Sequence, residues 1–172
     1  MVESELGLIP EGWEAISIKE LIDKGTLEKN QDGNHGEKHP KSHDYQSSGI
    51  PFLMARDIVD NLADLNSCNH ISIEQAKSLR VGFAKKGDVL LTHKATMGRV
   101  AILEEIDDFV VLSPQVTYYR IKNESLISKF YLYCTFLSER FQNILLFQSE
   151  QSTRKYLSIT NQIKIKIICP DV

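Results

Sequence analysis

The stretch from Phe83 to Ile121 is the part of the sequence that most limits the possible folds. Within it, short runs rich in β-branched and aromatic residues alternate with polar or turn-forming residues: FAKKGDVLLT, RVAIL, FVVL and QVTYYRI. Runs of this kind are typical of short β-strands, and Gly87-Asp88 marks a turn inside the first of them. The alternation of strand and helix that builds parallel sheets is not visible, so the stretch predicts a mixed α/β fold with mostly antiparallel strands.

Four further segments outside this stretch are also expected to be strands. Residues 13–16 form one short strand, and the others have the sequences IPFLMARDI, CNHISI and IKIKIICP. The run that begins at Ile50 is continuously apolar, which is typical of a strand buried on both faces. The last segment alternates between polar and apolar residues and ends at Pro170, which indicates a half-buried strand.

Helices are expected at three places. Ser17 and Ser72 each precede a Glu or Gln by three residues, which is the pattern of a capping box at a helix start. Near the end of the chain, six apolar residues recur at intervals of three and four: Ile127, Phe130, Cys134, Leu137, Phe141 and Ile144. This spacing places all six on one face of a long helix, which we expect to pack against the sheet. The alternative is a seam for a partner helix.

Length and composition predict one domain. With 172 residues and 42% hydrophobic content, the chain can bury a single sizeable core. We expect an acidic lead over residues 1–9 and a compact globular domain over 10–170. No apolar run approaches the roughly 18 residues of a membrane span. Cys68, Cys134 and Cys169 are too few and too widely spaced for a disulfide framework, so we expect core thiols in a soluble, cytoplasmic protein.

The charges are segregated along the chain. The net charge is −3, yet residues 77–99 carry six basic side chains against Asp88 alone, while residues 1–23 carry six acidic side chains against Lys19 alone. Such a distribution can present one basic face on an acidic protein. A solvated basic face without a partner is the alternative. Residues 29–49 contain no apolar residue except Tyr45, which predicts a long exposed loop.

The sequence lacks the common signatures of self-contained chemistry. No two glycines are separated by one residue, which excludes the dinucleotide-binding fingerprint, and no phosphate-cradling loop is present. His35, His39 and His43 recur at the helical spacing of metal ligands, but Gly36 and Pro40 oppose a helix there. A nucleophilic site built from Cys68 with His70 or His93 is a further alternative that no grouping in the sequence favours.

The remaining polar loops offer side chains that suit nucleic acid. THKATMGR, SPQ and SEQSTRKY supply Lys and Arg for phosphates, Arg and Gln for base edges, and hydroxyls for backbone oxygens. Each loop alone is a weak signal, because exposed loops commonly have this composition. A set of such loops gathered on one face would form a recognition surface.

The order of these segments resembles that of a target recognition domain from the DNA specificity subunit of type I restriction–modification systems. The segments that carry the resemblance are IPEGWEAISIKEL, GIPFLMARDI, FAKKGDVLLTHKATMGRVAI, VVLSPQVTYYRI and QSTRKYLSITNQIKIKIICP. Ala95 stands where the family often has Gly, and Pro114-Gln115 replaces Asn-Gln. After Pro170 the family continues into a conserved spacer helix, whereas this sequence stops at Val172.

The resemblance implies a non-catalytic reader of one half of a bipartite site in double-stranded DNA. The side chains expected to contact DNA are Lys41, His43, His93, Lys94, Arg99, Gln115, Ser152, Thr153, Arg154 and Lys155. The implied partners are DNA, a methyltransferase subunit and, through it, a restriction subunit, with S-adenosylmethionine and ATP bound only by those subunits. A homodimer would supply two half-sites. The alternative is a protein-interaction module that docks a subunit without touching DNA.

Overall fold

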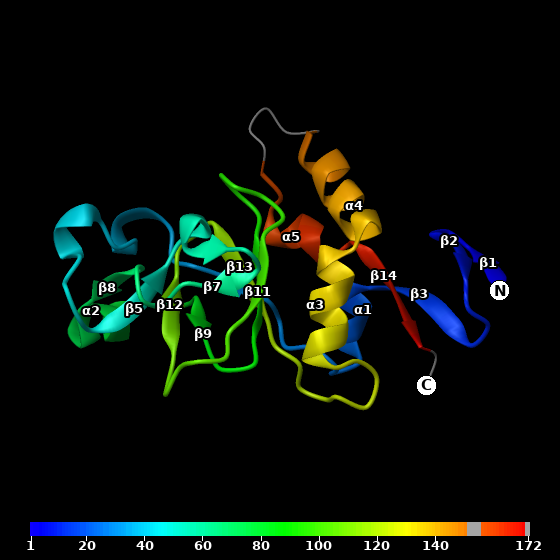
Figure 1. The fold of residues 1–172 in the computed structure, drawn as a ribbon, viewed down its shortest axis with the longest axis horizontal. Coiled ribbons are helices and arrows are strands. Elements are labelled where there is room, and N and C mark those ends of the chain that lie inside the picture. Colours follow the sequence, from blue (N-terminus) through cyan, green and yellow to red (C-terminus); the bar gives the residue numbers. More distant parts are fainter. Residues whose placement is uncertain (151–155, 171–172) are drawn as a thin grey trace.

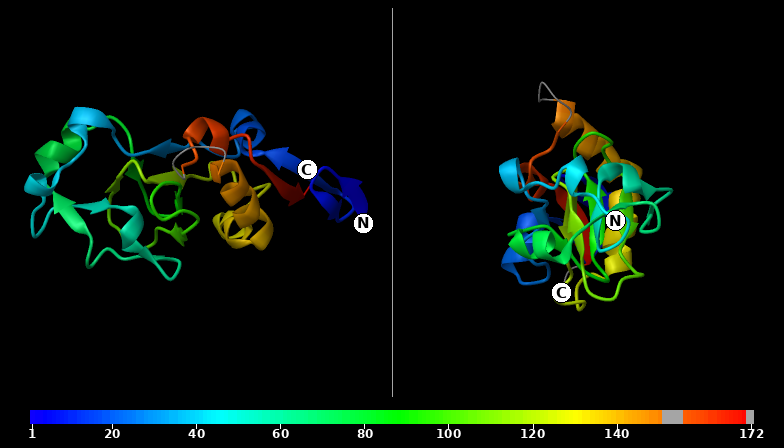
Figure 2. Two further views of the ribbon diagram at one scale, coloured as in Figure 1. Left: turned by 90° about the horizontal axis from the view of Figure 1, so that it is seen from above. Right: turned by 90° about the vertical axis from the view of Figure 1, so that its left-hand side faces the viewer.

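The computed structural model describes residues 1–150 and 156–170. The molecule is elongated, with two four-stranded sheets in one half and the longer helices in the other (Figures 1 and 2). Most strands pair antiparallel, as predicted, and within these residues the one parallel pair joins β5 to β12. No helix in the described part of the chain is both long and apolar enough to cross a membrane.

The central sheet has the strand order β11–β10–β13–β4. Its strands are β4 (Gln31–Asp32), β10 (Val89–Thr92), β11 (Val100–Ile102) and β13 (Val116–Tyr119). Every residue of β10 and β13 is buried. Successive side chains of β10 point to opposite faces of the central sheet. Val89 and Leu91 pack in the core that contains the helices, whereas Leu90 packs in the core on the other face.

The outer sheet has the strand order β8–β5–β12–β9. Its strands are β5 (Ile50–Leu53), β8 (Asn69–Ile71), β9 (Phe83–Ala84) and β12 (Val110–Leu112), and helix α2 (Ile73–Ser78) packs on it. The predicted turn at Gly87-Asp88 therefore does not close a hairpin: β9 belongs to the outer sheet and β10 to the central sheet. The Asp88 carboxylate accepts from the Lys85 amide at 2.7 Å and shapes this crossover.

A strand near each end of the sequence takes part in a separate two-stranded ribbon. Strand β3 (Trp13–Ser17) pairs antiparallel with β14 (Lys166–Pro170), whose burial alternates as the sequence predicted. The predicted helix start is also confirmed: α1 (Ile18–Asp23) begins with a capping box between Ser17 and Glu20. Ser72 likewise caps α2 by accepting from the Gln75 amide.

The predicted long helix is wrong as a single element. The chain forms α3 (Lys129–Leu137) and α4 (Glu139–Glu150), because Ser138 between them has an extended backbone. The predicted apolar face is confirmed for Ile127, Leu137, Phe141 and Ile144, which pack in or against the core. It is wrong for Phe130, which is 60% exposed, and for Cys134, which is also exposed. The buried apolar residues of the two helices are Leu132, Phe136, Phe141 and Leu145. Cys134 is thus no core thiol, whereas Cys68 and Cys169 are buried.

The prediction of an exposed loop over residues 29–49 is correct only for its second part. Residues 31–32 form β4, which pairs with β13, and Asn30, Asp32 and Asn34 are buried. Asn34 is held by two hydrogen bonds to the chain beyond α2, to the Val81 carbonyl and from the Arg80 amide. Two 3-10 turns, η1 (Gly36–Lys38) and η2 (Ser42–Asp44), follow.

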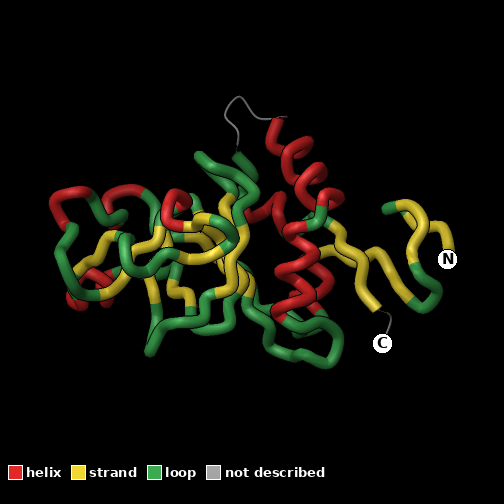
Figure 3. Tube along the Cα trace, viewed as in Figure 1, coloured by secondary structure: helices red, strands yellow, loops and turns green. Residues whose placement is uncertain are grey.

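The remaining elements are short. They are β1 (Val2–Ser4), β2 (Gly7–Ile9), η3 (Ala55–Asp57), β6 (Ile58–Val59), β7 (Leu62–Ala63) and α5 (Ile159–Gln162). The acidic lead forms the β1–β2 hairpin, which projects from the helical half of the molecule (Figure 1). Loops occupy much of the half that holds the two sheets (Figure 3).

Candidate nucleic-acid interface

Strand register brings two of the predicted recognition loops to the same edge of the central sheet. Thr92, the last residue of β10, pairs with Val116, the first residue of β13. The loop that follows β10 and the turn that precedes β13 must therefore lie together. The His93 amide donates to the Gln115 carbonyl at 3.0 Å and joins the two segments directly.

A cavity of about 290 Å³ lies between these loops and two further segments. Its walls come from four places far apart in the sequence, namely His35, Gly36, His39, Met54, Lys94, Ser113, Pro114 and Gln115. Lys94 and Gln115, both predicted DNA contacts, thus face a common space. The polar loop after β4 also contributes to it, through His35 and His39.

Lys41 and His43 were predicted to be the contacts of that polar loop, but they do not line the cavity. Both residues are exposed on or beside η2, and the Nε2 atom of His43 lies 3.6 Å from the Asp44 carboxylate. Both side chains are accessible to a ligand outside this cavity. The sequence could not rank the five histidines and lysines of the loop, because nothing local indicates which of them turn inward.

Lys94 is exposed at the rim of the cavity, beside Tyr156. Its ammonium nitrogen lies 5.7 Å from the centroid of the Tyr156 ring, and the two residues form an isolated β-bridge. Tyr156 directly follows Ser152, Thr153, Arg154 and Lys155, the last group of predicted contacts, which lie outside the described residues. The loop between β10 and β11 (residues 93–99), here called the basic loop, is therefore a neighbour of Tyr156, which directly follows that group.

The prediction that His93 contacts DNA from the surface is wrong. Its side chain is 0% exposed, and its Nδ1–H donates to the Leu157 carbonyl at 3.0 Å. Burial lowers the pKa of His93 to about 4, so the imidazole is neutral at pH 7. Its Nε2 atom, 3.8 Å from the Asp32 carboxylate, has no hydrogen-bond partner among the described residues. His93 thus anchors the loop from inside.

Arg99 also has a structural contact that the sequence did not indicate. Its side chain is half-buried, and one terminal guanidinium nitrogen donates to the Ile58 carbonyl at 2.8 Å. The Arg99 amide donates to the Thr92 hydroxyl and so closes the base of the loop. This geometry fastens the loop to strand β6, and it leaves less of the guanidinium for a ligand than was expected.

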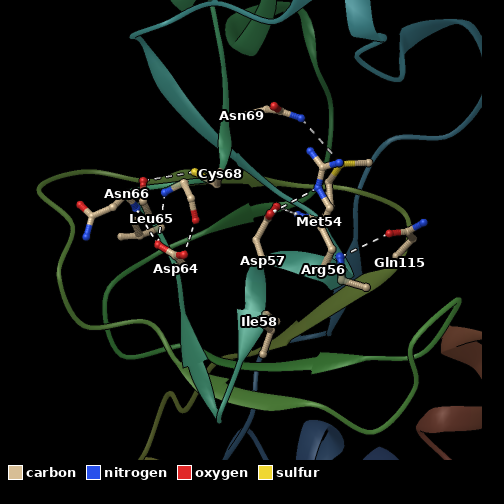
Figure 4. A network of polar contacts seen from close by, with 12 residues as sticks. Met54, Arg56, Asp57, Ile58, Asp64, Leu65, Asn66, Cys68, Asn69 and Gln115 are labelled. Atoms are coloured by element: carbon tan, nitrogen blue, oxygen red, sulfur yellow. Dashed lines mark hydrogen bonds and ion pairs between the residues drawn. The ribbon is translucent and has the colours of Figure 1, made fainter.

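Gln115 has a defined orientation. Its side-chain oxygen accepts from the Ala55 amide at 3.3 Å, and the amide nitrogen points away from that bond (Figure 4). No described residue accepts a hydrogen bond from its amide nitrogen, so this lining side chain has two donors free for a ligand. Lys94 is also a donor without acceptor capacity. Together they favour a ligand that carries hydrogen-bond acceptors.

His35 and His39 are lining residues that sequence reasoning did not select as contacts. The Nε2 atom of His35 lies 3.0 Å from the Asp32 carboxylate, and the His39 ring packs against Phe52. Burial lowers the pKa of His39, with a smaller contribution from His35. The spacing of the histidines in the sequence is that of metal ligands. Among the described residues no group of three His, Cys, Asp or Glu is arranged to hold a metal ion.

The nucleophile alternative has no support in the geometry of Cys68. The thiol is buried and donates weakly to the Leu65 carbonyl at 3.4 Å. Burial, and then the nearby Asp57 carboxylate, raise the pKa of Cys68 to about 11. A nucleophilic cysteine needs a lowered pKa, so Cys68 is an inert core thiol.

Known proteins resemble this chain in both sequence and fold. Residues 10–172 match the sequence profile of the family described as type I restriction modification DNA specificity domain. A curated relative, the type I restriction enzyme MjaVIII specificity subunit of Methanocaldococcus jannaschii, is 24% identical over 172 residues, which cover 98% of this chain and 38% of that protein.

Two solved structures have a similar fold. The HsdS subunit from Thermoanaerobacter tengcongensis is 17% identical with a TM-score of 0.64, over 95% of this chain and 34% of that one. The S subunit of the type I restriction-modification system from M. genitalium is 13% identical with a TM-score of 0.59, over 92% and 34%. The chain thus spans only about a third of the length of these proteins.

Proposed function

Because the chain belongs to the family of type I restriction modification DNA specificity domains, we propose that it recognises one half of a bipartite sequence in double-stranded DNA. In this proposal the domain catalyses no reaction itself. The recognition surface is the cavity rim around Lys94 and Gln115, with the loop after β4 and Tyr156 beside it.

The convergence of separate polar loops on one cavity is the observation that carries this proposal. Four segments contribute to the walls, which include an exposed lysine and an amide whose nitrogen has no acceptor among the described residues. Phosphate oxygens and the acceptor atoms of base edges are the natural ligands of such donors. Loops held on a rigid sheet can carry sequence choice without altering the fold.

The proposed partners follow from the relatives' names. They are called specificity subunits of type I systems, and we infer that this domain also works beside a methyltransferase subunit in the cytoplasm, with a restriction subunit joining through it. S-adenosylmethionine and ATP would bind on those subunits. A homodimer of this chain would present two half-site readers.

Duplex binding measured at different salt concentrations tests the proposal. Fluorescence anisotropy of a labelled duplex should show affinity that falls steeply between about 50 and 200 mM salt, because phosphate contacts release counterions. The titration should be repeated with the methyltransferase subunit present. Absence of binding at low salt in both conditions, or binding that salt does not weaken, would contradict the proposal. Capture of the subunit without DNA would favour the interaction-module alternative.

A further inference from the structure

Arg56 lies on a short turn beside the cavity, and the backbone of this turn is fixed by hydrogen bonds from several directions (Figure 4). The Asp57 carboxylate accepts from the Met54 amide at 2.8 Å, and the Asp57 amide donates to the Met54 carbonyl at 3.0 Å. The Ala55 amide donates to Gln115, as described above. The turn is therefore tied to the cavity wall at Met54 and Gln115.

The residues around Arg56 are anchored in the interior. Ala55 and Ile58 are 1% and 0% exposed, and the carbonyl of Ile58 accepts from Arg99. The Asp57 carbonyl accepts from the Asp64 amide at 2.8 Å. A turn held on both sides in this way cannot shift without breaking buried contacts.

The Arg56 side chain itself is 64% exposed on this fixed base. Its Nε atom lies 3.5 Å from the Asp57 carboxylate, whose side chain is only 7% exposed. Among the described residues, nothing accepts a hydrogen bond from the two terminal nitrogens of its guanidinium. The Arg56 guanidinium, which is planar and permanently charged, is thus exposed to solvent, and its Nε atom lies beside a buried carboxylate.

We propose that Arg56 contacts a pair of hydrogen-bond acceptors on the bound duplex. The pair is either O6 and N7 of a guanine or two phosphate oxygens, since both fit the guanidinium fork. This inference rests on the proposed function. It adds a contact that neither composition nor loop position indicated, because Arg56 stands in a segment that the sequence pattern assigns to a buried strand.

The rigid base explains why this arginine is favoured over other exposed cations. A lysine or arginine on a mobile loop loses rotamer freedom on binding, whereas a preorganised side chain loses less. Asp57 acts as a positioning residue: it fixes the turn and the Nε atom without reaching the ligand. Lys122 provides a contrast, since it is exposed in the loop after the opposite end of β13, and no described side chain accepts from its ammonium group.

The test compares Arg56→Ala, Arg56→Lys and Lys122→Ala in the full chain, with two readouts. Anisotropy with a fixed duplex gives affinity and its salt dependence, and selection from a random duplex library gives sequence preference. Arg56→Ala should weaken binding about tenfold or more, and Arg56→Lys should recover only part of the loss, since a lysine cannot bind two acceptors in one plane. Lys122→Ala should change affinity by less than about twofold, as expected of a charge far from the bound phosphates.

The outcomes separate the two acceptor sources. Loss of guanine preference at one position of the selected sequence assigns Arg56 to a base. A uniform loss with a salt slope reduced by about one assigns it to phosphate. Equal affinities for Arg56→Ala and Lys122→Ala, or full recovery with Arg56→Lys, would overturn the inference. Failure of the unmodified chain to bind any duplex would instead count against the proposed function.

Discussion

At the scale of single residues, His93 shows how the basic loop is held. The imidazole is buried and neutral, it donates to Leu157, and its ring lies 5.7 Å from that of Tyr156. Protonation would place a charge in the interior, where the Asp32 carboxylate lies 3.8 Å from the free nitrogen. The loop that carries Lys94 therefore depends on a residue that must remain uncharged.

This arrangement predicts a loss of stability in acid. The pKa of His93 is lowered from 6.5 to about 4, so the folded state binds the proton more weakly than the unfolded chain does. The stabilisation is complete above pH 6.5 and is lost as the pH falls towards 4, by about 3 kcal/mol in total. Urea unfolding at a series of pH values measures this loss.

His93→Asn is the matched variant for this measurement. Asparagine keeps an N–H donor near the Leu157 carbonyl but has no group that titrates in this range. The unfolding free energy of the variant should depend less on pH between 6.5 and 4, whatever its absolute value. An unchanged pH dependence in His93→Asn would show that other groups cause the acid loss.

Residue roles within the loops were the least predictable part of the site. The sequence identified the segments that contain Lys94 and Gln115, because polar segments between apolar strands usually form surface loops. It could not show that His93 turns inward or that Arg99 reaches Ile58, because those directions depend on contacts made by distant strands. Arg56 was missed for the same reason.

At the scale of elements, Gly33 explains how a polar segment enters the core. A Cβ atom at this position would lie 1.9 Å from the carbonyl oxygen of Leu112. The close approach allows the chain after β4 to run against the end of β12, where the Gly33 amide donates to the Ser113 carbonyl. A side chain here would push the wall that carries His35 away from Ser113.

Gly33→Ala should therefore lower the free energy of unfolding by about 3 kcal/mol, because the clash is with backbone and cannot be relieved by a rotamer change. Gly36→Ala is the control. It has open space around its Cβ but a φ of +71°, so only a left-handed backbone penalty of about 1 kcal/mol is expected. Equal denaturant midpoints for the two variants would argue against the tight approach at Gly33.

Strands were predicted better than helices. Continuous β-branched runs such as those of β10 and β13 must be buried, so their positions followed from composition. The assignment of β9 and β10 to different sheets did not follow from composition, because a turn signal does not identify the strands with which the two flanking strands pair. The break at Ser138 was equally hidden, since the apolar spacing continues through it. Part of its support comes from a distant segment, because the Gln142 side chain donates to the Gly98 carbonyl as well as to the Phe136 carbonyl.

Ser138 should contribute measurably to this break. Its hydroxyl accepts from the Phe141 amide and donates to the Thr135 carbonyl, so it serves the start of α4 and the end of α3. Ser138→Ala should cost about 1 kcal/mol of unfolding free energy, as for other helix caps. Ser48→Ala, an exposed serine outside any helix, should have almost no effect. Similar midpoints for both variants would contradict the capping role.

At the scale of the whole molecule, the distribution of charge matters more than its sum. The chain carries −3 in total, which would repel DNA if it were evenly spread. The proposed surface lies at the end of β10 and β13 that carries Lys94, whereas Lys122 follows the opposite end of β13.

Charge reversal at these two positions separates local from global electrostatics. Lys94→Glu and Lys122→Glu change the net charge equally, yet only Lys94→Glu should strongly weaken duplex binding, by tenfold or more at about 100 mM salt. Melting temperatures should remain close to that of the unmodified chain, because both side chains are exposed. Equal losses of affinity would mean that net charge alone governs association.

The parallel pairing of β5 with β12 also shapes how the molecule is assembled. Phe52 meets Val111, and Asp32 meets Thr117 in the neighbouring sheet, so the paired residues lie 59 and 85 positions apart in the sequence. Chains with many such non-local contacts fold slowly, since long segments must close before any pairing stabilises them. During synthesis, β4 and β5 emerge well before their partners. The cavity walls can therefore come together only after β13 has left the ribosome, and refolding from denaturant should be slow compared with that of a helical protein of equal length.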